Sequence, residues 1–153
     1  MAHSNQLKPN HKAIQHYYET LQTFSDQKVT HEGATETAFS RLLADSAHAH
    51  GWTLIPKLPM RVGAKQIAPD GTVKDEFNLR RGFWEAKDTD DDLDKEIRKK
   101  IDKGYPLGNM IFEDTRQAVL YQNGQEANRV TSASGDHAVP RRGKARLANL
   151  QFT

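Results

Sequence analysis

Two acids and a lysine near the middle of the chain are the residues whose types and spacing suggest chemistry. Asp70 follows Pro69, and a single residue, Ala86, separates Glu85 from Lys87. Carboxylates are ligands that hard divalent cations prefer, and a nearby ammonium can position an attacking water. The three side chains therefore suggest metal-assisted cleavage of a phosphodiester. A salt bridge on a solvated hairpin explains them equally well, because an acid-x-lysine triplet is common by chance.

The segments that carry these residues are predicted to form an antiparallel hairpin. Residues 72–77 and 82–87 are two short strand-prone runs, and residues 78–81 between them are few enough to close a turn. The second run includes Phe83 and Trp84, whose large apolar side chains require burial. The charged residues are therefore expected beside a hydrophobic core.

A turn at residues 78–79 would fix the register of this hairpin. Asp70 would then lie opposite Lys87, and Thr72 would lie opposite Glu85. Because side chains alternate along a strand, Glu85 and Lys87 point to the same face. This register predicts that two carboxylates and an ammonium converge.

Two of the acids also have ordinary structural explanations, which stay open. Asp70 lies in a Pro-Asp-Gly segment, which is a common turn sequence. Glu36 lies in the first turn of a predicted helix, where an acid interacts favourably with the helix dipole. The functional alternative for Glu36 is a third acid directed at a metal ion.

The composition of the 153-residue chain excludes several classes of site. It has no cysteine, so disulfides, thiolate zinc sites and cysteine nucleophiles are excluded. Its net charge of +2 means that any basic surface must come from local clusters. No apolar run is long enough to span a bilayer, and residues 1–10 do not resemble a signal peptide. A cytoplasmic protein without membrane contact is expected.

Apolar spacing predicts two helices and a strand before the hairpin. The helices are expected over residues 11–25 and 34–50, where apolar residues recur at helical intervals. A strand is expected over residues 52–62. Because Pro56 and Pro59 interrupt it, this strand should be kinked or lie at a sheet edge.

A third helix is expected to begin soon after Lys87. Thr89 and Asp92 resemble a capping box, and Glu96 with Lys100 is an acid-before-base pair one helical turn apart. The buried stripe of this helix should consist of apolar residues at helical spacing, namely Leu93, Ile97 and Ile101.

The remaining segments complete the predicted organisation. Short strands are expected over residues 109–112 and 118–122. Residues 1–30 are interpreted as a polar lead and a helix, and residues 31–126 as the main domain. Residues 127–153 are rich in Ser, Gly, Ala and Arg, so they are interpreted as a basic, flexible tail.

The predicted order of elements resembles the αβββαβ core of the PD-(D/E)xK nuclease superfamily. Pro69-Asp70 and Glu85-Ala86-Lys87 match the superfamily motif literally. The resemblance implies an α/β (α+β) fold of the restriction-endonuclease-like class, with a mixed central sheet flanked by helices.

A closer resemblance covers residues 31–126. Residues 82–88, 91–97, 103–106 and 109–114 are similar to the N-terminal, Mrr-like nuclease domain of single-polypeptide type I (type ISP) restriction-modification enzymes. In those enzymes helicase, methyltransferase and target-recognition regions follow the nuclease domain. This sequence does not contain them.

The resemblance implies roles for individual residues. Asp70 and Glu85 would ligate Mg²⁺, with the carbonyl of Ala86 as a further ligand, and Lys87 would orient the attacking water. Glu36 matches the helix-borne acid that many members place near the metal, so it is a third candidate ligand.

Some assignments within this resemblance remain open. Asp75 competes with Asp70 for the role of the first metal ligand, because a different hairpin register would favour it. Basic residues near the motif are candidates for contacts with DNA phosphates: Lys57, Arg61, Lys65, Arg80 and Arg81.

These observations predict an enzyme, a Mg²⁺-dependent deoxyribonuclease that acts as an endonuclease domain of restriction-modification type. Its expected partners are double-stranded DNA and the helicase, methyltransferase and target-recognition regions that this chain lacks. The alternative is a catalytically silent DNA-binding or interaction module, or a truncated remnant of a larger restriction enzyme.

Overall fold

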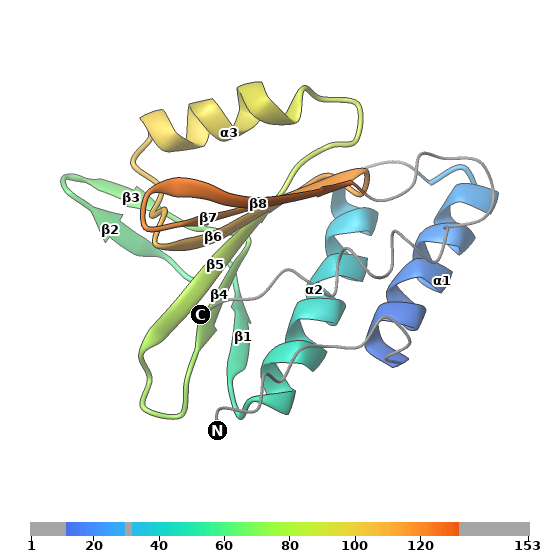
Figure 1. The fold of residues 1–153 in the computed structure, drawn as a ribbon, viewed down its shortest axis with the longest axis horizontal. Coiled ribbons are helices and arrows are strands. Elements are labelled where there is room, and N and C mark those ends of the chain that lie inside the picture. The colour runs from blue at the N-terminus through green and yellow to red at the C-terminus, as the bar shows by residue number, and fades with distance from the viewer. Residues whose placement is uncertain (1–11, 30–31, 132–153) are drawn as a thin grey trace.

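The computed structural model describes residues 12–29 and 32–131, with a central sheet between two layers of helices (Figure 1). Residues 1–11 of the predicted lead and residues 132–153 of the predicted tail lie outside the described residues. Within the two described ranges, no helix combines the length and the apolar character needed to cross a bilayer.

Two helices cover one face of the sheet (Figure 1). They are α1 (Lys12–Asp26) and α2 (Glu32–Ala49), which confirms the helices predicted from the apolar spacing. Their inward stripes supply Ile14 and Tyr17 from α1 and Phe39 from α2, each almost fully buried.

The central sheet has six strands in the order β1-β4-β5-β6-β7-β8. Their bounds are β1 Thr53–Pro56, β4 Gly71–Lys74, β5 Arg80–Ala86, β6 Asn109–Glu113, β7 Gln117–Gln122 and β8 Gln125–Thr131. Neighbouring strands are antiparallel except β5 and β6, which are parallel. A parallel pair needs a crossover, and α3 (Leu93–Asp102) supplies it across the second face (Figure 1). The predicted mixed sheet flanked by helices is therefore confirmed.

The strand predicted over residues 52–62 lies at the edge of the sheet as β1, as one of the two alternatives predicted, but its predicted length is wrong. The chain leaves the sheet after Pro56, and Lys57 adopts a left-handed backbone conformation with a φ of 51°. A separate two-stranded hairpin follows, formed by β2 (Met60–Val62) and β3 (Lys65–Ile67). The prolines predicted the interruption, but the sequence pattern did not predict that the second part pairs elsewhere.

β4 and β5 form the predicted hairpin, but its predicted register is wrong. Thr72 lies opposite Phe83, whereas a turn at residues 78–79 would have placed it opposite Glu85. The physical reason is that residues 75–79 form a longer turn between the two strands. From Gly71 to Val73 the pairing is displaced by two residues, which keeps these side chains on their predicted faces. The register shifts once more between Val73 and Lys74.

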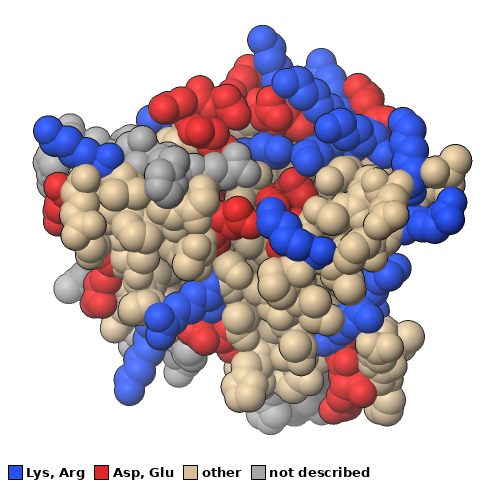
Figure 2. Space-filling view, turned by 180° about the vertical axis from the view of Figure 1, so that it is seen from behind, with Lys and Arg blue, Asp and Glu red and all other residues tan. Residues whose placement is uncertain are grey.

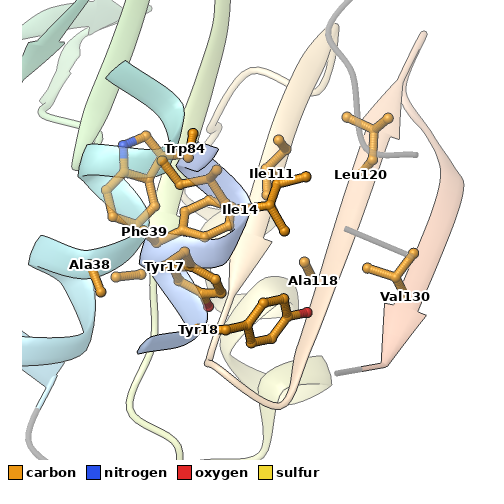
Figure 3. Packing of buried hydrophobic residues seen from close by; sticks show 13 residues of the cluster. Ile14, Tyr17, Tyr18, Ala38, Phe39, Trp84, Ile111, Ala118, Leu120 and Val130 are labelled. Carbon is orange, nitrogen blue, oxygen red and sulfur yellow. The ribbon is translucent and has the colours of Figure 1, made fainter. Parts of the chain in front are cut away.

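The two faces of the sheet carry separate hydrophobic cores. The core under α1 and α2 contains Phe39 and Trp84, whose ring centroids lie 5.2 Å apart (Figure 3). The core under α3 contains Phe83, Leu93 and Ile97. Phe83 thus faces the core under α3, whereas Trp84 and Ala86 face the core under α1 and α2, which confirms the predicted alternation along this strand.

The start of α3 differs from the prediction. Asp92, and not Thr89, is the N-cap, because its carboxylate accepts a hydrogen bond from the amide of Lys95 at 3.2 Å. The hydroxyl of Thr89 instead donates to the carbonyl of Asp114 at 2.9 Å. Ile101 was expected in the buried stripe, but it is exposed at the end of the helix.

The last strand was not predicted. The strands expected over residues 109–112 and 118–122 are present as β6 and β7, and β8 then pairs with β7 up to Thr131. Residues 127–131, interpreted from the sequence as part of the tail, therefore belong to the sheet. Their alternation is weak because Val130 is the one buried residue of β8.

Candidate active site

Asp70 lies at the start of β4, between two residues that fix its backbone. The side chain of Pro69 is fully buried. A Cβ atom added to Gly71 would lie 2.0 Å from Nε1 of Trp84, so only glycine allows the indole to pack against this strand. The Pro-Asp-Gly segment is therefore packed into the structure at the point from which Asp70 projects.

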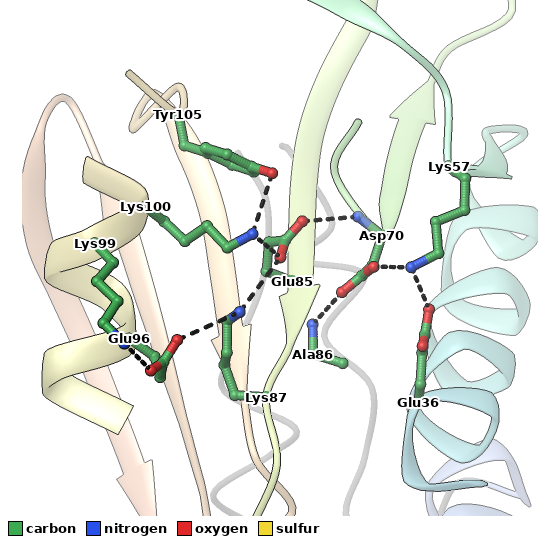
Figure 4. A network of polar contacts seen from close by, with 10 residues as sticks. All are labelled: Glu36, Lys57, Asp70, Glu85, Ala86, Lys87, Glu96, Lys99, Lys100 and Tyr105. Carbon is green, nitrogen blue, oxygen red and sulfur yellow. Dashed lines mark hydrogen bonds and ion pairs between the residues drawn. The ribbon is translucent and has the colours of Figure 1, made fainter. Parts of the chain in front are cut away.

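The structure brings Asp70 and Glu85 together by reciprocal hydrogen bonds (Figure 4). The amide of Asp70 donates to Oε1 of Glu85 at 3.0 Å. The amide of Ala86 donates to Oδ2 of Asp70 at 2.8 Å. Each carboxylate is thus anchored by the backbone of the strand that carries the other. The corrected register explains this contact, since it moves Asp70 from opposite Lys87 to beside Glu85.

Glu85 lies in a buried, crowded position and is 3% exposed. Its Oε2 atom is 3.2 Å from Nζ of Lys100 and 3.9 Å from Nζ of Lys87. Burial and the Asp70 carboxylate raise the pKa of Glu85, while Lys100 and Lys87 oppose that rise. Two ammonium groups therefore help to keep this buried carboxyl group ionised.

Lys87 follows β5 and points toward α3 (Figure 4). Its backbone amide donates to the carbonyl of Glu113 at 2.8 Å, which continues the parallel pairing of β5 and β6 beyond the strand. Its ammonium lies between the carboxylates of Glu85 and Glu96, at 3.9 and 3.8 Å. The predicted convergence of Asp70, Glu85 and Lys87 is therefore seen as a chain of contacts, with Glu85 in the middle.

Lys100 was not predicted to belong to this site. The sequence suggested that it pairs with Glu96 within α3, but it reaches across to Glu85 instead. The hydroxyl of Tyr105 lies 3.2 Å from its ammonium, which also sits 4.6 Å from the centroid of that ring. A signal existed, because Lys100 follows the buried Ile97 by three residues and so shares its inward face.

Glu36 contacts the site through a lysine. Its Oε1 atom is 3.1 Å from Nζ of Lys57, and the same ammonium bonds Oδ1 of Asp70 (Figure 4). Burial acts to lower the pKa of Lys57, but the hydrogen bonds to Asp70 and Glu36 raise it above its ordinary range. The carboxylates of Glu36 and Asp70 thus lie on either side of the Lys57 ammonium group.

Asp75, the competitor of Asp70, has a different set of partners. Its Oδ1 accepts hydrogen bonds from the amides of Phe77 and Leu79, both at 2.9 Å, and Oδ2 lies 2.8 Å from Nε of Arg81. Burial acts to raise the pKa of Asp75, but these hydrogen bonds lower it below its ordinary value. Asp75 therefore organises the long turn of the β4–β5 hairpin.

Other basic residues singled out from the sequence lie at the surface. Arg61, Lys65 and Arg80 are exposed, while Arg81 binds Asp75 and packs over the ring of Trp52. Figure 2 shows Lys and Arg side chains surrounding acidic side chains on one face of the molecule. Such a mixture of charges can bring a polyanion near carboxylates.

The residues of the site fit a hard divalent cation. Asp70 and Glu85 are carboxylates held in place by the backbone, and the Lys57 ammonium beside Asp70 shows that a cation is accommodated there. Mg²⁺ commonly takes one or two carboxylates and keeps several waters. Among the residues that the structure describes, no three or more acids, cysteines or histidines are arranged to hold a metal together.

Two comparisons found nothing and a third found similar structures. No family model matches the sequence, and no curated protein matches it either. The chain is similar to a solved structure described as a DrdV–DNA complex, with 37% sequence identity and a TM-score of 0.80. That match covers 91% of this chain and 13% of the DrdV chain. A protein of family DUF820 from Anabaena variabilis is 13% identical with a TM-score of 0.47, over 72% of this chain and 73% of that one.

The match to the DrdV chain extends over nearly the whole of this chain. The mixed sheet has the restriction-endonuclease-like order, and Asp70 and Glu85 meet where the hairpin begins and ends. The chain belongs to the PD-(D/E)xK nuclease superfamily.

Proposed function

We propose that this chain is a Mg²⁺-dependent endonuclease domain that hydrolyses phosphodiester bonds of double-stranded DNA. The observation that carries the proposal is the reciprocal anchoring of Asp70 and Glu85, with the Lys87 ammonium 3.9 Å from Glu85. The similarity to a chain solved as a complex with DNA supports DNA as the substrate. Asp70 and Glu85 are the proposed metal ligands, and Glu36 is a third candidate.

Each residue of the site has a role in this proposal. A bound Mg²⁺ would supply Lewis acidity and charge neutralisation at the phosphate. Asp70 and Glu85 would hold it with oxygens whose orientations the strand amides already fix. The Lys87 ammonium would orient the attacking water and stabilise negative charge that develops on the phosphate. Lys100 would hold Glu85 in place from the α3 side.

The chain spans 13% of the length of the DrdV chain that it matches, so further regions are part of the proposal. We propose that helicase, methyltransferase or target-recognition regions of restriction-modification type, as in the type ISP enzymes, direct where it cuts. A catalytically silent DNA-binding module is the second candidate. The observation that favours it is that no three metal-holding side chains are grouped within the described residues.

Cleavage of supercoiled plasmid by the full chain tests the proposal. We expect nicking with Mg²⁺ and none with EDTA, because the water must be activated at a bound cation. Asp70→Asn should slow nicking by about a hundredfold, since it removes one charge from the cation site. Asp75→Asn is the matched control. It keeps an oxygen for the amides of Phe77 and Leu79 but loses the ion pair with Arg81, so it should lower Tm while leaving Mg²⁺ uptake unchanged.

The results separate the alternatives. If Asp75→Asn abolishes nicking and Asp70→Asn does not, Asp75 is the metal ligand. If the protein binds DNA but neither takes up Mg²⁺ in calorimetry nor nicks the plasmid, it is the silent module.

A further inference from the structure

Lys57 is placed beside the candidate metal site by its backbone as well as its side chain. It follows the last residue of β1 and has a left-handed φ of 51°. Its amide donates to the carbonyl of Asp70 at 3.1 Å, so its main chain is tied to the residue that its side chain also contacts. This double attachment directs the ammonium toward the acids.

The ammonium of Lys57 lies between two carboxylates that come from different elements (Figure 4). Asp70 approaches it from the start of β4, and Glu36 approaches it from α2 at 3.1 Å. The two carboxylates and the single ammonium group together carry a net negative charge. A divalent cation in the same place would neutralise both of them.

The three partners differ in how easily they can leave. The side chain of Lys57 is 57% exposed, whereas those of Asp70 and Glu36 are 8% and 23% exposed. Asp70 is also held by the amide of Ala86. A long, flexible lysine side chain can therefore swing into solvent while the acids stay in place.

We propose that Lys57 is a tethered counter-ion, which occupies the place of a divalent cation between Asp70 and Glu36 and leaves when the metal binds. The inference rests on the proposed function, because it assumes that these acids bind Mg²⁺. In the metal-free protein Lys57 limits the repulsion between the acids. The same contact competes with the metal and reduces its apparent affinity.

Competition from the Lys57 ammonium should weaken the binding of Mg²⁺. A ligand that must displace an existing partner binds more weakly than it would to the open site. Replacing Lys57 with methionine keeps an unbranched apolar stem and removes the charge, so Mg²⁺ should bind more tightly. Because the ammonium is partly exposed, the expected change in Kd is modest, about threefold to tenfold.

Calorimetric titration of the full chain with Mg²⁺, without DNA, tests the inference. The wild type is compared with Lys57→Met and with Lys65→Met, which removes the same charge from an exposed position on the separate β2–β3 hairpin. We expect a lower Kd in Lys57→Met and an unchanged Kd in Lys65→Met. Lys57→Gln serves as a second variant if the methionine variant folds poorly.

Thermal unfolding gives a second readout that does not depend on activity. In EDTA, Lys57→Met should have a lower Tm than the wild type, because Asp70 and Glu36 lose their shared counter-ion. Adding Mg²⁺ should raise the Tm of this variant more than that of the wild type.

Each outcome decides the matter. Tighter Mg²⁺ binding in Lys57→Met alone supports the tethered counter-ion. An equal or weaker affinity in that variant, with binding by the wild type intact, overturns it and leaves the proposed metal site standing. If neither protein takes up Mg²⁺, the metal part of the proposed function fails and this inference fails with it.

Discussion

Replacing Glu85 with glutamine is expected to reduce Mg²⁺-dependent plasmid nicking by about a thousandfold. Glu85 is central to the site, because its oxygens contact the amide of Asp70 and the ammonium groups of Lys100 and Lys87. The neutral amide would weaken metal binding and leave two ammonium groups without their carboxylate. The change would therefore affect both the proposed metal site and Lys87, the residue proposed to orient the attacking water.

The glutamine variant should nevertheless fold. Burial raises the pKa of Glu85, so the folded protein already resists the charged form of this side chain. The glutamine keeps an oxygen for the amide of Asp70, but the ammonium groups of Lys100 and Lys87 lose their carboxylate, so Tm should fall while the fold is retained. Loss of nicking in a variant that still unfolds cooperatively above the assay temperature therefore separates a catalytic effect from unfolding.

A control fixes the meaning of this result. Glu126→Gln makes the same chemical change on β8, where Glu126 is exposed and pairs with Arg129. It should nick at the wild-type rate. Equal nicking by the wild type and Glu85→Gln would exclude the proposed active site, and unimpaired nicking by Lys87→Ala would remove the role assigned to Lys87.

The general architecture was predictable because local patterns determine it. The stripes of α1 and α2 repeat at helical spacing, and the alternation around Trp84 assigns Glu85 to the opposite face from the indole. Such patterns involve residues that are close together in the sequence, so the sequence alone is enough to predict them. The same alternation placed Glu85 and Lys87 on one face, whereas Asp70 was joined to them through a hairpin register that was wrong by two residues.

The details that failed depend on contacts between distant segments. The hairpin register was wrong because the side chain of Asp75 holds a longer turn than the strand pattern implies. The partner of Lys100 was wrong because α3 packs over β5, so that Glu85 is available to it as well as Glu96. The position of Lys57 follows from a left-handed residue after β1, which no spacing rule indicates.

Stability is expected to fall as the pH rises from 5 to 8, and the cause is an acid on the other face of the sheet. Glu113, at the end of β6, is 2% exposed. Burial raises its pKa from an ordinary 4.5 to about 8, although hydrogen bonds from the hydroxyl of Tyr17 at 2.8 Å and the amide of Thr115 at 2.6 Å oppose the rise. The folded protein therefore binds a proton that the unfolded chain has lost in this range.

The sign and size of the effect follow from linkage. A group with a raised pKa in the folded state stabilises it fully below the unfolded pKa, and this contribution is lost as the pH rises to the folded pKa. Over three pH units the change is about 4 kcal/mol, at about 1.4 kcal/mol for each unit. Glu113→Gln keeps an oxygen for Tyr17 and Thr115 but cannot ionise, so its stability should lack this decline.

Urea unfolding of both proteins between pH 5 and pH 8 measures this difference. Acids distant from Glu113 titrate alike in both proteins, so the difference between the two free energies of unfolding reports Glu113 together with its coupling to the neighbouring Asp114. The free energy of unfolding of Glu113→Gln should rise relative to that of the wild type by about 4 kcal/mol across the range. Parallel curves for Glu113→Gln would mean that Glu113 is already ionised at pH 5 in the folded protein. In that case a neighbouring cation must balance its charge, because a bare carboxylate is too costly to bury at this depth.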